Sequence, residues 1–117
     1  MPYNETLANR IREKLLLLPD VEEKEMFGGL VFMVDSKMCI GVMKEKLMLR
    51  INPESLPSLD RQDGWEQMMM SKTVMKGYIL VSEDVLNREE ELKFWLNLAL
   101  EFNPLAKASR KKNSFVF

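Results

Sequence analysis

The stretch that decides the fold runs from Met26 to Ile51 and reads MFGGLVFMVDSKMCIGVMKEKLMLRI. Two short polar breaks, at residues 35–37 and 44–46, divide it into three apolar runs. Apolar runs of this length, bounded by a few polar residues, are typical of short β-strands joined by tight turns. The stretch therefore predicts three strands in succession.

The third run shows the clearest strand period. Leu47, Leu49 and Ile51 alternate with Met48 and Arg50, so the two sets point to opposite faces of a strand. The first run is apolar at every position, which predicts a strand that is central or covered on both faces.

Glycines interrupt these predicted strands at Gly28, Gly29 and Gly41, and Gly77 begins a later one. Glycine inside a strand usually marks a bulge, a bend or the close approach of another element. Either a helix crosses the sheet there or a ligand touches the backbone, and we favour the helix. Gly28-Gly29 is not a phosphate-binding loop, because no G-x-G-x-x-G pattern and no Walker lysine accompany it.

A helix is predicted before this region, over about 5–18. Asn4 is suited to cap its start, and apolar side chains recur at helical spacing up to Leu18. Pro19 ends the helix because the residue before a proline is disfavoured in the helical conformation. Residues 21–24 are expected to form a short connector.

The second half predicts two more strands and a closing helix. Asn52-Pro53 breaks the sheet and begins a short helical segment, and strands are expected at 65–70 and 77–82. Asn87, followed three residues later by Glu90, resembles a capping box that opens a helix over about 88–103.

The order of elements is thus α-β-β-β-(α)-β-β-α. Strands grouped in this way favour an α+β fold, an antiparallel sheet with helices packed on it, over a parallel α/β fold. No linker or repeat divides the chain, so we expect one domain over residues 1–107 and a basic, loosely held tail over 108–117.

Composition narrows the class of protein. Charged residues make up 30% of the 117, and no apolar run approaches the roughly 20 residues that span a bilayer. The N-terminus lacks the apolar segment of a signal peptide, and the single Cys39 cannot form an intrachain disulfide. We therefore expect a cytoplasmic protein without a membrane partner.

The same counts remove most catalytic mechanisms. The chain has no histidine, so a Ser-His-Asp triad, a Cys-His pair and a histidine-ligated metal are excluded. One cysteine cannot build a zinc or iron–sulfur site, and Cys39, between Met38 and Ile40, is expected to be a buried structural thiol. We expect no catalytic residue, metal or cofactor, and hence no enzyme.

Two features point to a binding role. The chain has ten methionines, which suit an irregular core or, as the alternative, a permissive groove for a partner. The closing helix is apolar over roughly two thirds of its girth, wider than the stripe of about 100° that a surface helix needs. Either the core buries it deeply or Phe94, Leu98 and Phe102 form an interface with a protein partner or a second copy.

The tail suggests an alternative function. Lys107, Arg110, Lys111 and Lys112 could contact phosphate, which would make the protein a nucleic-acid accessory factor. Without these four residues the chain holds 13 basic and 18 acidic side chains, and such a negative body matches nucleic acid poorly.

Three segments resemble the N-terminal domain of the TfoX/Sxy family, which is linked to the regulation of bacterial natural competence. They are the Met-Phe-Gly-Gly run continued through Ile51, the Met75-Lys-Gly-Tyr78 motif, and the helix around Trp95. The resemblance implies a fold similar to that of secretion chaperones and a cytosolic, non-enzymatic regulator. Full-length members carry a further helical domain, whereas the resemblance here covers only the first domain and extends over nearly the whole sequence. We therefore expect a stand-alone copy of the first domain. Some members bear names such as RNA methyltransferase, but the sequence has no glycine-rich cofactor loop.

Overall fold

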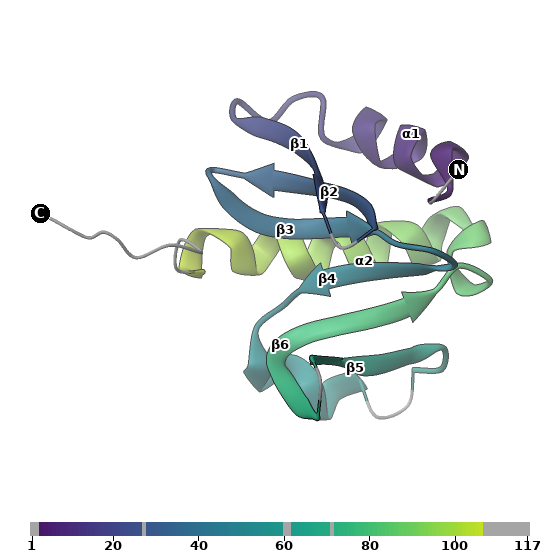
Figure 1. Cartoon of the computed structure of the whole chain (residues 1–117), viewed down its shortest axis with the longest axis vertical. Coiled ribbons are helices and arrows are strands. Elements are labelled where there is room, and N and C mark those ends of the chain that lie inside the picture. The colour runs from purple at the N-terminus through teal and green to yellow at the C-terminus, as the bar shows by residue number, and fades with distance from the viewer. Residues whose placement is uncertain (1–2, 27, 60–61, 71, 107–117) are drawn as a thin grey trace, which may run out of the picture.

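One antiparallel sheet of six strands carries the structure, a computed structural model that describes residues 3–26, 28–59, 62–70 and 72–106. Along the chain the strands are β1 (Val21–Met26), β2 (Gly29–Val34), β3 (Lys37–Val42), β4 (Lys46–Arg50), β5 (Trp65–Met70) and β6 (Thr73–Ser82). Across the sheet their order is β1-β2-β3-β4-β6-β5, and each neighbouring pair is antiparallel (Figure 1). The three strands predicted for the central stretch are confirmed as β2, β3 and β4.

The helices α1 (Glu5–Lys14) and α2 (Glu89–Phe102) pack on one side of this sheet (Figure 1). In the described part of the chain they are accompanied by three short 3₁₀ segments, at Pro53–Leu59, Val85–Asn87 and Asn103–Leu105. The main core lies between the helices and the sheet, with Ile11 of α1, Phe32 of β2 and Trp95 of α2 among its buried side chains. The predicted α+β fold with helices on an antiparallel sheet is confirmed.

The start of the chain corrects one prediction and confirms another. Asn4 caps α1, since its side-chain oxygen accepts a hydrogen bond of 3.0 Å from the Leu7 amide. The helix ends at Lys14, however, and not at Leu18. The prediction of a connector at residues 21–24 is wrong, because these residues belong to β1. This strand lies at the edge of the sheet, and its exposed charged side chains do not form the apolar run by which the other strands were predicted.

The closing helix begins differently from the prediction. Arg88 is its N-cap residue and makes no side-chain capping bond, while Asn87 belongs to the preceding 3₁₀ segment, so the capping box is wrong. Three glutamates in the first turn instead complement the helix dipole. One of them, Glu89, pairs with Lys14 and Arg10 and so ties α2 to α1.

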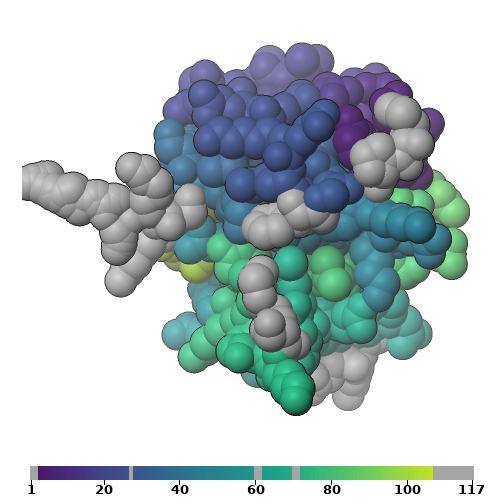
Figure 2. Space-filling view, viewed as in Figure 1, coloured from purple at the N-terminus to yellow at the C-terminus, as the bar shows by residue number. Residues whose placement is uncertain are grey.

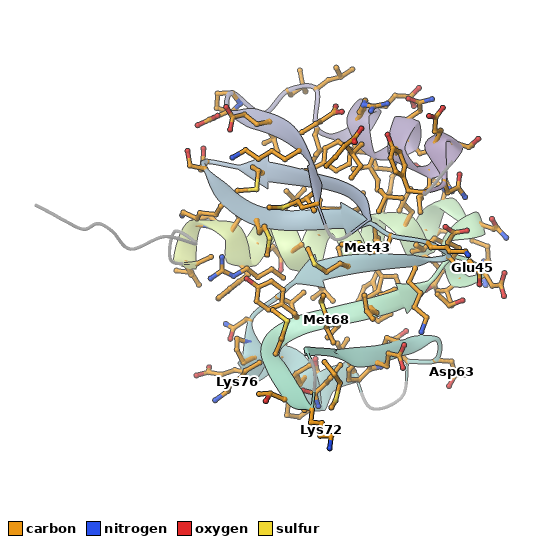
Figure 3. The ribbon with its side chains drawn as sticks, in the orientation of Figure 1. Met43, Glu45, Asp63, Met68, Lys72 and Lys76 are labelled. Carbon is orange, nitrogen blue, oxygen red and sulfur yellow. The ribbon has the colours of Figure 1, made fainter. Side chains whose placement is uncertain are left out.

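The opposite face of the sheet carries a second apolar cluster, which we call the methionine cluster. Its buried members are Val31, Met33, Met38 and Met48, and Met26, Met43, Met68, Tyr78 and Leu80 pack against them. Figure 1 shows the strands in front of α2, Figure 2 gives the same view in space-filling form, and Figure 3 labels Met43 and Met68. Six of the ten methionines therefore fill space in this cluster.

The close neighbours of Gly29 and Gly41 are the backbone of an adjacent strand and methionine side chains. The prediction that a helix crosses the sheet at these glycines is therefore wrong. Gly28 lies in the β1–β2 turn with φ +73°, not inside a strand. Gly29 begins β2, and a Cβ there would stand 2.3 Å from the carbonyl oxygen of Val42. Gly41 pairs with Met48 of β4, and a Cβ on Gly41 would lie 3.1 Å from the Met48 methyl carbon.

Candidate functional site

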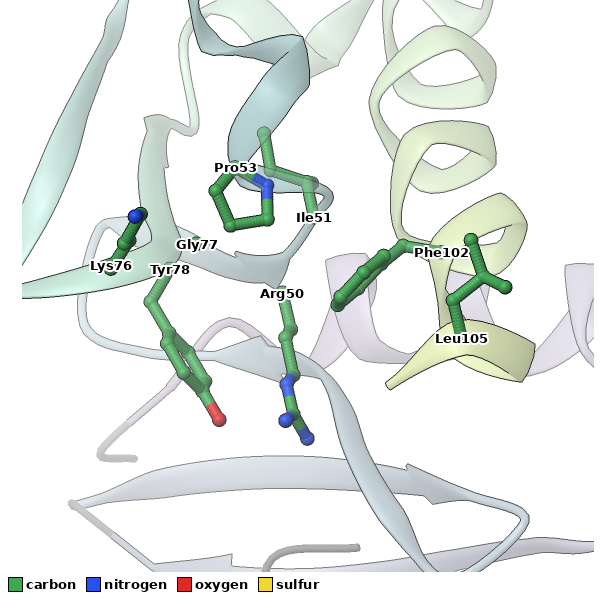
Figure 4. Close-up of a pocket in the computed structure, with 8 residues that line it drawn as sticks. All are labelled: Arg50, Ile51, Pro53, Lys76, Gly77, Tyr78, Phe102 and Leu105. Carbon is green, nitrogen blue, oxygen red and sulfur yellow. The ribbon is translucent and has the colours of Figure 1, made fainter. Parts of the chain in front are cut away.

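A pocket of about 300 Å³ opens where β4 leaves the sheet, between β6 and the end of α2 (Figure 4). Its lining combines two cations with aromatic and aliphatic side chains and no carboxylate: Arg50, Ile51, Pro53, Lys76, Gly77, Tyr78, Phe102 and Leu105. We call it the Arg50 pocket.

The sheet register brings the polar side of this pocket together. Arg50, the last residue of β4, pairs directly with Tyr78 of β6. The neighbouring Gly77 has φ +87°, and its carbonyl accepts a 2.7 Å hydrogen bond from the Ile51 amide. A Cβ at Gly77 would lie 3.1 Å from the Ile51 carbonyl oxygen and 3.3 Å from Pro53 Cγ. The positive φ therefore favours glycine at this position, and a Cβ there would in addition be tightly packed.

The apolar side of the pocket is held by the end of α2. Phe102 closes that helix, and Leu105 follows in the last 3₁₀ segment. Between them Asn103 is buried and donates a 3.1 Å hydrogen bond to the Val34 carbonyl. The Asn103 carbonyl accepts a 3.0 Å bond from Lys37 Nζ, so both ends of the β2–β3 turn fix the segment.

The guanidinium of Arg50 is the unusual group in this pocket. Its Cζ lies 5.5 Å from the centre of the Tyr78 ring, and Figure 4 shows the two side chains side by side, with Phe102 beyond Arg50. Its Nη1 is buried and has no hydrogen-bond partner among the described residues. A buried donor without a partner costs about 1–3 kcal/mol, and more when it is charged. Among the described residues no acidic side chain pairs with Arg50, so the pocket offers a positive charge to an anion.

Cys39 lies near enough to Arg50 to feel its charge, but it is not a reactive thiol. Burial raises the pKa of Cys39 to about 12, while the Arg50 charge acts in the opposite direction. Only 1% of the residue is exposed, which agrees with the predicted structural role.

We expect Cys39 in the folded protein to react with Ellman's reagent at pH 8 more slowly than in urea-denatured protein. A pKa near 12 instead of the usual 8.5 lowers the thiolate fraction on the order of 1,000-fold, and burial slows the reaction further. Reaction rates of native and denatured protein at pH 8 check this. Equal rates would contradict the buried position of the thiol.

The predicted interface residues lie along one side of α2 and lead into the Arg50 pocket. Phe94 is 38% exposed, Leu98 and Phe102 are partly exposed, and their spacing of four residues places them on one side of the helix. Leu105, 69% exposed, extends this series past the helix end. We call these four residues the α2 strip. The helix is therefore not buried around its whole girth.

The sequence alone did not reveal the pocket. Arg50, Lys76 and Tyr78 were noted only within strand or family motifs, and Leu105 lies beyond the predicted helix. One signal was present: Arg50 is a charged side chain that follows Met48 on the same face of the strand and lies between the apolar residues Leu49 and Ile51. Its pairing with Tyr78 depends on the sheet register.

Other predicted features bear on the site less directly. Lys107, Arg110, Lys111 and Lys112 lie outside the described residues, so the phosphate contact stays a prediction. Within the described ranges, no group of three histidine, cysteine or acidic side chains is arranged to hold a metal ion. None of the helices in that part of the chain has the length and apolar character needed to cross a membrane.

Comparison with known proteins identifies a family for the chain. The family model of the TfoX N-terminal domain matches residues 13–103. No curated protein and no solved structure matches the chain. Two segments that carry the family resemblance, Leu47–Ile51 and Met75–Tyr78, supply Arg50 and Tyr78 to the same pocket. Since the match covers most of its 117 residues, the chain belongs to the TfoX N-terminal domain family.

Proposed function

We propose that the domain is a non-enzymatic regulatory module of the cytoplasm that acts by binding another protein. The observation that carries this proposal is the α2 strip, a partly exposed apolar series that ends beside Arg50, whose Nη1 has no hydrogen-bond partner among the described residues. Aromatic side chains and arginine are the groups that most often dominate binding energy at protein interfaces. Membership of a family associated with competence regulation supports the regulatory role.

Charge favours a different protein as the partner over a second copy of this chain. The pocket lining holds Arg50 and Lys76 and no acidic residue. A symmetric dimer formed through the same face would bring like charges of two copies toward one another, which is unfavourable. A homodimer therefore serves as the alternative outcome of the test.

Affinity capture from the native host tests the proposal with a matched pair of variants. Leu105→Asp introduces a charge on the α2 strip, and Leu17→Asp introduces the same charge at a leucine that is 98% exposed, after α1. Both side chains are exposed, so circular dichroism should show both variants folded like the parent. We expect Leu105→Asp to lose the captured protein and Leu17→Asp to retain it.

Two results would contradict this. Retention of the same protein by Leu105→Asp at the level of the parent would remove the α2 strip as the binding surface. A parent dimer in light scattering that Leu105→Asp converts to a monomer would assign the strip to a second copy.

A further inference from the structure

We infer that the Arg50 pocket binds a carboxylate of the partner, presented by an aspartate or glutamate next to an apolar side chain. The inference rests on the proposed function and adds the chemistry by which the partner is recognised.

The charge at the site favours an anion. Arg50 forms no ion pair with an acidic side chain among the described residues, and its Nη1 is buried without a hydrogen-bond partner. Lys76 adds a second positive charge at the exposed rim. The planar guanidinium presents its N–H groups in the geometry that carboxylate oxygens accept. A carboxylate in the pocket, beside the part of the Arg50 side chain that lines it, would neutralise this charge.

The number of donors favours a carboxylate over a phosphate. The side-chain donors in the lining are the Arg50 guanidinium, the Tyr78 hydroxyl and the exposed Lys76 ammonium. Phosphate sites usually surround a dianion with several donors, often backbone N–H groups at a helix N-terminus. Here α2 approaches with its C-terminal end, whose dipole is negative. A singly charged carboxylate, held chiefly by one guanidinium, fits this arrangement better.

The walls and the surroundings favour a peptide over a free small molecule. Ile51, Pro53, Phe102 and Leu105 form an apolar wall beside the cation. The pocket volume of about 300 Å³ exceeds one acidic side chain and leaves room for an apolar neighbour. The α2 strip continues from Leu105 and Phe102 toward Phe94. The backbone of a peptide whose acidic and apolar side chains occupy the pocket would lie along this strip. A segment of a protein uses both surfaces, whereas a small acid uses the pocket alone.

Two capped peptides that differ by one group test the inference, acetyl-Phe-Glu-Phe-amide and acetyl-Phe-Gln-Phe-amide. Binding to the ¹⁵N-labelled domain is followed by NMR through the Gly77 and Phe102 amides and the Arg50 Nε–H group. We expect the glutamate peptide to shift these resonances and the glutamine peptide to bind at least about 10-fold more weakly, because it lacks the charge. This comparison needs no protein variant, so it does not depend on the stability of a mutant.

Protein variants then locate the charge. Arg50→Gln should abolish the preference for the glutamate peptide, while Lys72→Gln, which removes an exposed charge outside the pocket lining, should keep it. Equal affinity of the two peptides, or an unchanged preference in Arg50→Gln, would overturn the inference. Phenylacetate that binds as tightly as the glutamate peptide would overturn the assignment to a peptide. If Leu105→Asp loses the captured host protein while Arg50→Gln binds it as the parent does, this inference fails and the proposed function stands.

Discussion

Replacement of Trp95 by alanine is expected to lower the free energy of unfolding by about 3–5 kcal/mol, the range for a large aromatic side chain removed from a core. Trp95 has no exposed surface and belongs to the main core between α2 and the sheet. Its indole N–H donates a 3.2 Å hydrogen bond to Glu91 one turn earlier, so truncation also leaves that carboxylate without the bond. Domains of this size are stable by about 5–15 kcal/mol, so the loss is a large part of the total.

Urea denaturation of the parent and the variant measures this loss, and Phe94→Ala is the control. Phe94 is the neighbouring aromatic residue, with ring centres 5.0 Å apart in an edge-to-face arrangement, but it lies on the exposed α2 strip. Its truncation should cost less than half as much as that of Trp95. A loss below about 1 kcal/mol for Trp95→Ala would contradict its core position, because buried aromatic truncations cost several times more.

Replacement of Gly29 by alanine is expected to destabilise the domain by about 3 kcal/mol, at the upper end of the cost of forcing atoms into a packed region. The added methyl carbon would stand 2.3 Å from the Val42 carbonyl oxygen and 3.2 Å from Met43 Cα. Both are backbone atoms, the first at the end of β3 and the second in the β3–β4 connection, where the Met43 amide donates to the Lys46 carbonyl. Relief of the clash therefore requires the connection to move, and a change of rotamer is not sufficient.

Gly28→Ala is the matched control for this prediction. A Cβ at Gly28 would meet nothing within 4 Å, but φ is +73°, a left-handed conformation that costs an alanine about 1–2 kcal/mol. Urea denaturation should therefore rank the two variants, with Gly29→Ala the less stable. The reverse order would contradict the close approach of β2 to the β3–β4 connection.

Much of the fold follows from local sequence patterns. Apolar runs separated by Asp35-Ser36 and Lys44-Glu45 are enough to predict β2, β3 and β4, because the polar pairs occupy the turns between them. The cap at Asn4 is equally local. The predicted cap at Asn87 failed because a 3₁₀ segment competes for the residues before α2.

Features that depend on strand pairing were not accessible from the sequence. The segment VEEKEM is too charged to suggest a strand, yet it pairs along its whole length with β2 at the sheet edge. A helix was predicted to cross Gly29 and Gly41, but a neighbouring strand and methionine side chains lie there. The sequence does not tell which face of a strand meets the helices. The Arg50 pocket combines both difficulties: it requires the register of Arg50 with Tyr78 and the position of Phe102 at the end of α2.

The most direct measurement of the binding role is the dissociation constant of the captured host protein, determined by isothermal titration calorimetry for the parent, Leu105→Asp and Leu17→Asp. Binding through the α2 strip and the Arg50 pocket predicts at least about 10-fold weaker binding for Leu105→Asp, which corresponds to roughly 1.4 kcal/mol. Leu17→Asp should bind like the parent. Equal dissociation constants for the parent and Leu105→Asp would contradict a partner bound at this end of α2.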